Sequence, residues 1–213
     1  MKKTSKRTAG SRKRSPRRPR PVHPPRPTAH ELALAAFADL AKRLGLRWYV
    51  FGAQAVNVHG VPRATADLDV TVDLAGRPAS DLVAALANAG FEPRFADAAF
   101  IATTHVIPVV HHGSSMPIDV VLAGPGLEQL FLDEVHVEKL GRREVPFLSL
   151  ENLIVTKVLA GRPKDLEDVR ELLARRANEV DLAHIEALLA QLERALDQSD
   201  LRALFQRLRR EAA

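Results

Sequence analysis

One short segment constrains the fold of this chain more than any other. Residues 66–74, with the sequence ADLDVTVDL, alternate strictly between polar and apolar side chains. Successive side chains of a β-strand point to opposite faces, so the pattern predicts a half-buried strand. Asp67 and Asp69 share its polar face with Thr71 and Asp73, and their Cβ atoms would lie about 6 to 7 Å apart. They could bind one cation, although an exposed polar face is the simpler interpretation of this pattern alone.

A glycine turn lies upstream of this strand. The run RWYVF (47–51) predicts a strand that stops at Gly52, and AQAVNVHG (53–60) predicts a short helix directly after it. The backbone N–H groups of Gly52, Ala53 and Gln54 would then point outward at the positive end of the helix, which suits phosphates. Packing alone also explains many turns of this kind.

A third carboxylate lies further along the chain. Asp119 stands between Ile118 and Val120 in PIDVVL (117–122), which predicts another strand. An acid in the middle of a strand is unfavourable unless a cation or a hydrogen-bond donor meets it. Asp119 is therefore a candidate third member of the acidic site.

The remaining patterns indicate an α/β half followed by a helical half. We expect a mixed sheet of four to six strands with flanking helices, and then a C-terminal helical segment. The further strands are expected at 91–96 and 100–110, with a hairpin over 135–148. The helices are expected at 29–44, 78–89, 149–161, 163–176, 181–196 and 200–212. This divides the chain into a tail (1–27), an α/β domain (28–148) and a helical region (149–213).

Positive charge is concentrated at one end of the chain. The 213 residues carry a formal net charge of +5, but residues 1–27 hold 11 Lys and Arg and no acid, which leaves the remainder at −6. Prolines and like charges predict a disordered tail. Two interpretations stay open for it: a solvated tail without a partner, or nonspecific attraction to nucleic-acid phosphates.

Composition also bounds the cofactor and the compartment. The sequence contains no cysteine, so a metal would be held by oxygen or histidine ligands, and oxygen ligands favour magnesium. His105, His111 and His112 form a rival group, but their spacing fits no metal signature, and surface turns are the preferred interpretation. The sequence shows neither a run of about eighteen apolar residues nor a secretory signal, so we expect a cytoplasmic protein without membrane contact.

Taken together, these motifs resemble the DNA polymerase β-like nucleotidyltransferase superfamily. The segments FGAQAVNVHGVPRATADLDVTV (51–72) and SLENLIVTKVLAGRPKDLEDV (149–169) are most similar to the minimal, AbiEii-type prokaryotic members. The resemblance covers roughly residues 47–175. It implies a nucleotidyltransferase-type sheet in which Asp67, Asp69 and Asp119 hold Mg²⁺ or Mn²⁺.

The resemblance also implies roles outside the acidic group. It places nucleotide phosphates at the turn of Gly52 and Ala53, gives Lys157 a phosphate-binding or catalytic role, and makes Asp165 a supporting residue. Arg63 and Thr65 lie on the approach to the acidic strand, where they would orient the loop or touch substrate. Many active members have Gly-Ser or Gly-Gly at the turn, and Ala53 removes the hydroxyl that a serine would offer to the triphosphate.

The function implied is two-metal transfer of a nucleoside monophosphate from an NTP to an acceptor hydroxyl. The acceptor would be tRNA or another RNA, a protein or a small molecule, and relatives suggest a place in a toxin–antitoxin or defence system. The alternative is a catalytically inactive binding module or an antitoxin-like partner with the same fold, which contacts nucleic acid through the basic tail.

Overall fold

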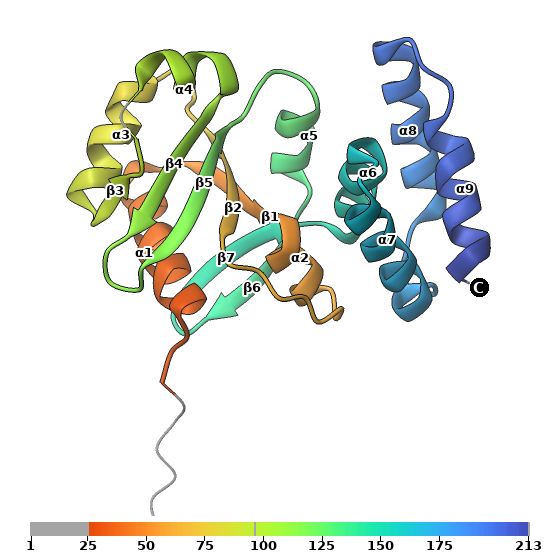
Figure 1. The fold of residues 1–213 in the computed structure, drawn as a ribbon, viewed down its shortest axis with the longest axis horizontal. Helices are drawn as coiled ribbons and strands as arrows, with labels where there is room; N and C mark the ends of the chain where they lie inside the picture. The colour runs from red at the N-terminus through yellow and green to blue at the C-terminus, as the bar shows by residue number, and fades with distance from the viewer. Residues whose placement is uncertain (1–25, 96, 213) are drawn as a thin grey trace, which may run out of the picture.

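The computed structural model describes residues 26–95 and 97–212. The strands are β1 (Arg47–Phe51), β2 (Leu68–Asp73), β3 (Phe91–Pro93), β4 (Val106–His111), β5 (Met116–Leu122), β6 (Val135–Leu140) and β7 (Arg143–Leu148). They form one sheet in the order β3-β4-β5-β2-β1-β7-β6 (Figure 1). The pairs β2–β5 and β1–β7 are parallel and the other neighbours are antiparallel. The expected mixed sheet is therefore confirmed.

In the part of the chain that the structure describes, five helices accompany the sheet: α1 (Ala29–Leu44), α2 (Gly52–Val58), α3 (Ala79–Asn88), α4 (Ala98–Thr104) and α5 (Leu127–Asp133). The first of them begins with the expected capping box, in which Thr28 and Glu31 exchange hydrogen bonds. Its Phe37 packs against Trp48 of β1 and Phe91 of β3, with ring centroids 5.0 and 5.9 Å apart. Helix α1 thus crosses one face of the sheet and forms the hydrophobic core with it.

The C-terminal helices are α6 (Leu150–Ala160), α7 (Pro163–Arg176), α8 (Leu182–Leu196) and α9 (Leu201–Ala212), as expected. They lie beside the sheet, and α6 contacts α2 while α8 and α9 pack against α6 and α7 (Figure 1). Hydroxyl and carboxylate caps at Ser149 and Asp181 begin α6 and α8. We call residues 26–148 the sheet lobe and residues 149–212 the helical lobe.

Three sequence-based expectations about the strands are wrong. The sheet has seven strands in the described segments, not four to six. The strand expected over 100–110 is partly helix, because Asp97 caps the N–H groups of Ala99 and Phe100 and begins α4. His105 then ends that helix in the left-handed conformation, with φ 56°, and β4 starts at Val106. The strand expected over 91–96 is also shorter, since β3 ends at Pro93.

The basic tail predicted for residues 1–27 falls, up to residue 25, outside the described residues. Within the described segments, no helix combines the length and the apolar character that a bilayer-spanning helix needs.

Candidate active site

The three candidate carboxylates meet at one cavity. Strands β2 and β5 are parallel neighbours, and their register pairs Asp69 directly with Asp119. Asp67 precedes β2 by one residue, on the same side as Asp69. All three line a cavity of about 490 Å³ between the sheet lobe and the helical lobe, which we call the cleft. The sheet topology thus brings together acids that are fifty residues apart in sequence.

Gly52 is required at the floor of this cleft for two reasons. Its φ of +65° lies in the left-handed region, which side chains other than glycine rarely adopt. Strand β1 is antiparallel to β2 with Phe51 opposite Asp69, so the Asp69 carboxylate lies over Gly52, and an added Cβ would overlap its Oδ2 atom. Ala53 also lines the cleft, whereas Gln54 lines a separate hollow beside α1.

The acids of the cleft repel one another. Burial, together with the negative charges of Asp67 and Asp119, raises the pKa of Asp69 to about 6. The cations Lys164 and Arg162 act in the opposite direction but do not compensate. Asp69 therefore ionises less readily than an ordinary aspartate, and a cation bound beside it would favour its ionised form.

The donor set of the cleft fits a hard divalent cation. Three carboxylates offer only oxygen ligands, which magnesium and manganese prefer, and the raised pKa of Asp69 marks a site where a bound cation would be stabilising. In the described segments no three acidic or histidine side chains converge closely enough to form a ready-made metal cage. The carboxylate of Asp119 instead pairs with the guanidinium of Arg94, and Thr65 Oγ1 donates to Asp67 Oδ1 at 2.7 Å.

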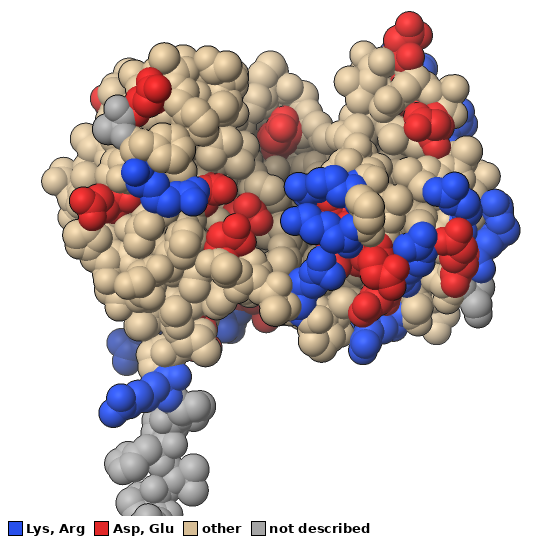
Figure 2. Space-filling model, in the orientation of Figure 1, with Lys and Arg blue, Asp and Glu red and all other residues tan. Residues whose placement is uncertain are grey.

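The opposite wall of the cleft carries cations from α6 and α7. Figure 2 shows the groove between the lobes, with acidic side chains on the sheet lobe and basic side chains on the facing edge of the helical lobe. Lys157 is buried there, and its Nζ atom donates to Asp165 Oδ1 at 3.1 Å and to Asp168 Oδ2 at 2.7 Å. Its assignment to phosphate binding stays a prediction, and its two carboxylate partners give it a structural role as well.

The loop that leads to β2 is fixed at both ends. The Asn57 side chain accepts a hydrogen bond from the backbone N–H of Arg63 and donates to the Arg63 carbonyl, at 2.5 and 2.9 Å. The Arg63 guanidinium lies 3.1 Å from Asp168 Oδ1 on α7. Arg63 thus connects the loop to the helical lobe, and Thr65 donates to Asp67. The orienting role considered for both residues stays a prediction.

Sequence reasoning did not single out Arg162, Lys164 and Asp168, which line the cleft, or Arg94, which pairs with the cleft residue Asp119. Arg162 and Lys164 flank Pro163 in the stretch KVLAGRPKDLEDV, so a search for cations beside the helix start would have found them. Asp168 lies one helical turn after Asp165 on α7, which places both on one face. Arg94 carries no local signal, because its partner Asp119 is reached only through the pairing of β3, β4 and β5.

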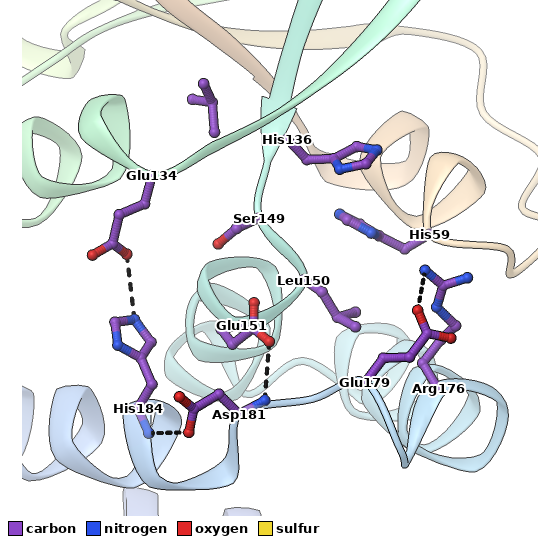
Figure 3. Close-up of a pocket in the computed structure, with 11 residues that line it drawn as sticks. His59, Glu134, His136, Ser149, Leu150, Glu151, Arg176, Glu179, Asp181 and His184 are labelled. Carbon is purple, nitrogen blue, oxygen red and sulfur yellow. Dashed lines mark hydrogen bonds and ion pairs between the residues drawn. The ribbon is translucent and has the colours of Figure 1, made fainter.

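A second cavity, of about 600 Å³, lies at the other end of α6 (Figure 3). His184 of α8 lies 3.3 Å from Glu134 of the sheet lobe, so these two side chains join the lobes. Within the helical lobe, Glu151 of α6 accepts the backbone N–H of Asp181 at 3.0 Å. His59 at the end of α2 is 4% exposed and bonds the Leu148 carbonyl at 2.9 Å. Polar contacts around this cavity thus help to fix the helical lobe to the sheet lobe.

Neither a scan against models of protein families nor a search of curated proteins finds a match to this sequence. Solved structures do match. An antigenic nucleotidyltransferase-like protein from Paracoccidioides brasiliensis is similar with a TM-score of 0.52 at 17% identity, over 83% of this chain and 91% of that one. The antibiotic-resistance factor ANT(2'')-Ia is similar with a TM-score of 0.50 at 15% identity, over 79% of this chain and 97% of that one. At these identities the likeness shows the fold.

Proposed function

We propose that this chain, which has the nucleotidyltransferase fold, is a metal-dependent enzyme that moves a nucleoside monophosphate from an NTP to an acceptor hydroxyl. The observation that carries the proposal is the meeting of Asp67, Asp69 and Asp119 at one wall of a cleft whose other wall is basic. Such a cleft has a place for a divalent cation on one side and for polyphosphate on the other.

Asp67, Asp69 and Asp119 would hold Mg²⁺ or Mn²⁺. When bound, the metal neutralises charge on the phosphates and lowers the pKa of the attacking hydroxyl. The residues of the chain position the reactants around it. Gly52 lets the Asp69 carboxylate approach the backbone closely, and the turn that it begins with Ala53 offers N–H donors to a phosphate.

The remaining site residues orient the two walls of the cleft. Thr65 fixes the Asp67 carboxylate through its hydrogen bond, and Arg63 ties that loop to α7. Lys157 adds positive potential from its buried position, and Asp165 holds its ammonium group. No covalent enzyme intermediate is required, because catalysis of phosphoryl and nucleotidyl transfer rests on positioning and charge stabilisation.

The acceptor belongs to one of three classes: tRNA or another RNA, a protein, or a small molecule. The name of ANT(2'')-Ia, an antibiotic-resistance factor, favours including antibiotics with free hydroxyls in the search. We also propose that the chain belongs to the AbiEii-type group and acts in a toxin–antitoxin or defence system, and transfer to RNA or protein would support this.

The test is label transfer from NTPs labelled at the α-phosphate, with magnesium and a panel of tRNA, cell lysate and hydroxyl-bearing antibiotics. We expect transfer by the wild type and its loss in Asp69→Asn. The matched control is Asp73→Asn, because Asp73 lies on the same strand but does not line the cleft. Absence of transfer from every NTP, or equal transfer by wild type and Asp69→Asn, would refute the proposal.

The second candidate function is a silent binding module. Two observations favour it: Ala53 offers no hydroxyl to a triphosphate, and Asp119 is already neutralised by Arg94. Calorimetry with ATP separates the two candidates, because the silent module should show no magnesium-dependent binding. If the module contacts nucleic acid through residues 1–27, affinity should fall steeply with salt and disappear when the tail is deleted.

A further inference from the structure

The cations of the cleft differ in what they already contact. The ammonium of Lys157 binds two carboxylates, with only 7% of its side chain exposed. The guanidinium groups of Arg63 and Arg162 each contact one of the same carboxylates, at 3.1 and 2.5 Å. Lys164 also lines the cleft, but it makes no ion pair with any residue of the described segments. Lys164 is thus the cleft cation whose charge is available to a ligand.

Lys164 shares the cleft with the acids of the sheet lobe. It lines the same cavity as Arg162, Asp67 and Asp69. It is the second residue of α7, after Pro163 at the first helical position. The positive end of this 14-residue helix therefore adds to the charge of Lys164.

The stability of α7 does not explain this placement. Lysine in the first turn of a helix opposes the helix dipole, which costs a few tenths of a kcal/mol, and acids are favoured there. The side chain is exposed and buries no apolar surface that would offset the cost. An anionic ligand in the cleft would offset this cost, because both the ammonium of Lys164 and the positive end of the helix would attract it.

We infer that Lys164, with Arg162 beside it, is the direct binding site for the triphosphate of the substrate nucleotide. This inference rests on the proposed function and changes the assignment within it. Lys157, whose ammonium already donates to Asp165 and Asp168, acts as the tether between α6 and α7 that positions Lys164. A nucleotide–metal complex would then lie across the cleft with its cation toward Asp69 and its phosphates toward α7.

The experiment is calorimetric titration of the full chain with inorganic tripolyphosphate, in EDTA, and with ATP in magnesium. Lys164→Gln should weaken tripolyphosphate binding about tenfold, because it removes one charge-assisted contact. Lys164→Arg should retain binding. The matched control is Lys139→Gln, which removes an exposed lysine of β6 outside the cleft and should leave the affinity unchanged. Thermal unfolding of each variant should match the wild type, because Lys164 makes no internal ion pair.

Equal affinity of wild type and Lys164→Gln for tripolyphosphate would overturn the inference, as would a wild type that binds no tripolyphosphate. These results are distinguishable from failure of the proposed function. If label transfer occurs but Lys164→Gln binds and reacts like the wild type, the transferase proposal is supported and the assignment of Lys164 is refuted. If polyphosphate binding depends on Lys164 but no acceptor receives label, the assignment of Lys164 is supported and the transferase proposal is refuted.

Discussion

Lys157→Met tests whether the buried lysine is a structural tether. The Lys157 side chain is 7% exposed, and its partners Asp165 and Asp168 are each 4% exposed, so this is a buried ion network. Removing one partner of such a network costs about 3 to 5 kcal/mol, because the remaining charges stay buried without compensation. Arg162 and Arg63 still contact the two carboxylates, which places the expected loss near the lower end, at about 3 kcal/mol.

Urea unfolding measures this loss directly. The chain has a single tryptophan, and Trp48 is buried in the core against Phe37, so its fluorescence reports unfolding of the sheet lobe. For a domain of this size a loss of about 3 kcal/mol corresponds to a melting temperature lower by about 6 to 12 °C. A triple variant, Lys157→Met with Asp165→Asn and Asp168→Asn, should recover most of the stability because the unpaired charges are removed as well.

The pH dependence of the stability loss tests the same ion network independently. Burial raises the pKa of Asp165, but hydrogen bonds from Arg162 and Lys157 outweigh burial and hold it below the usual 3.8. A carboxyl with a lowered folded-state pKa stabilises the fold above its unfolded pKa and loses that contribution as the pH falls through the folded value. The deficit of Lys157→Met should therefore be largest at neutral pH and shrink below about pH 3.8.

A stability change below about 1 kcal/mol in Lys157→Met, or no recovery in the triple variant, would refute the tether. The exposed lysine replacement Lys139→Met serves as the control and should change stability by less than about 0.5 kcal/mol.

Three further outcomes are expected. Gly52→Ala should destabilise the protein by about 2 to 4 kcal/mol in urea unfolding, because alanine is strained at φ +65° and its Cβ overlaps Asp69. An unchanged midpoint of urea unfolding would contradict this prediction. Burial lowers the pKa of His59 below 6.5, so the wild type should lose stability as the pH falls below that value, and His59→Gln should flatten this slope between pH 6.5 and 5. Arg94→Gln should raise Mn²⁺ affinity up to about fivefold in paramagnetic-resonance titrations, since it frees the half-exposed Asp119 carboxylate, and equal affinities would contradict this.

Local patterns predicted the parts of the fold that depend on neighbouring residues. The alternation of residues 66–74 predicts β2 because strand side chains alternate, and the box of Thr28 and Glu31 predicts the start of α1 because both bonds are made within one turn. Local preference gave the wrong prediction for the segment 98–104, which forms α4. Its isoleucine and threonines favour a strand, but the cap at Asp97 and the left-handed His105 enclose a helix.

The candidate site needed information that no local pattern contains. Local patterns pointed to Asp69 and Asp119 separately, and only the family resemblance grouped them. The parallel pairing of β2 with β5 is what makes them neighbours. The sequence predicted Lys157 as a cation for the ligand, which stays a prediction, and the packing of α7 against α6 also supplies it with two buried acids. Contacts between distant segments, including that of Arg94 with Asp119, decided which charges are neutralised within the protein and which are left for a ligand.

The order of the strands also bears on how this protein behaves at high concentration. The outer strands of a sheet expose unpaired backbone groups that invite aggregation with other chains. One outer strand, β3, has only three residues and ends in Pro93, which has no N–H to donate. The other, β6, carries His136, Glu138 and Lys139 on an exposed stretch. Short length at one border and charge at the other should protect the seven-stranded sheet from edge-to-edge assembly.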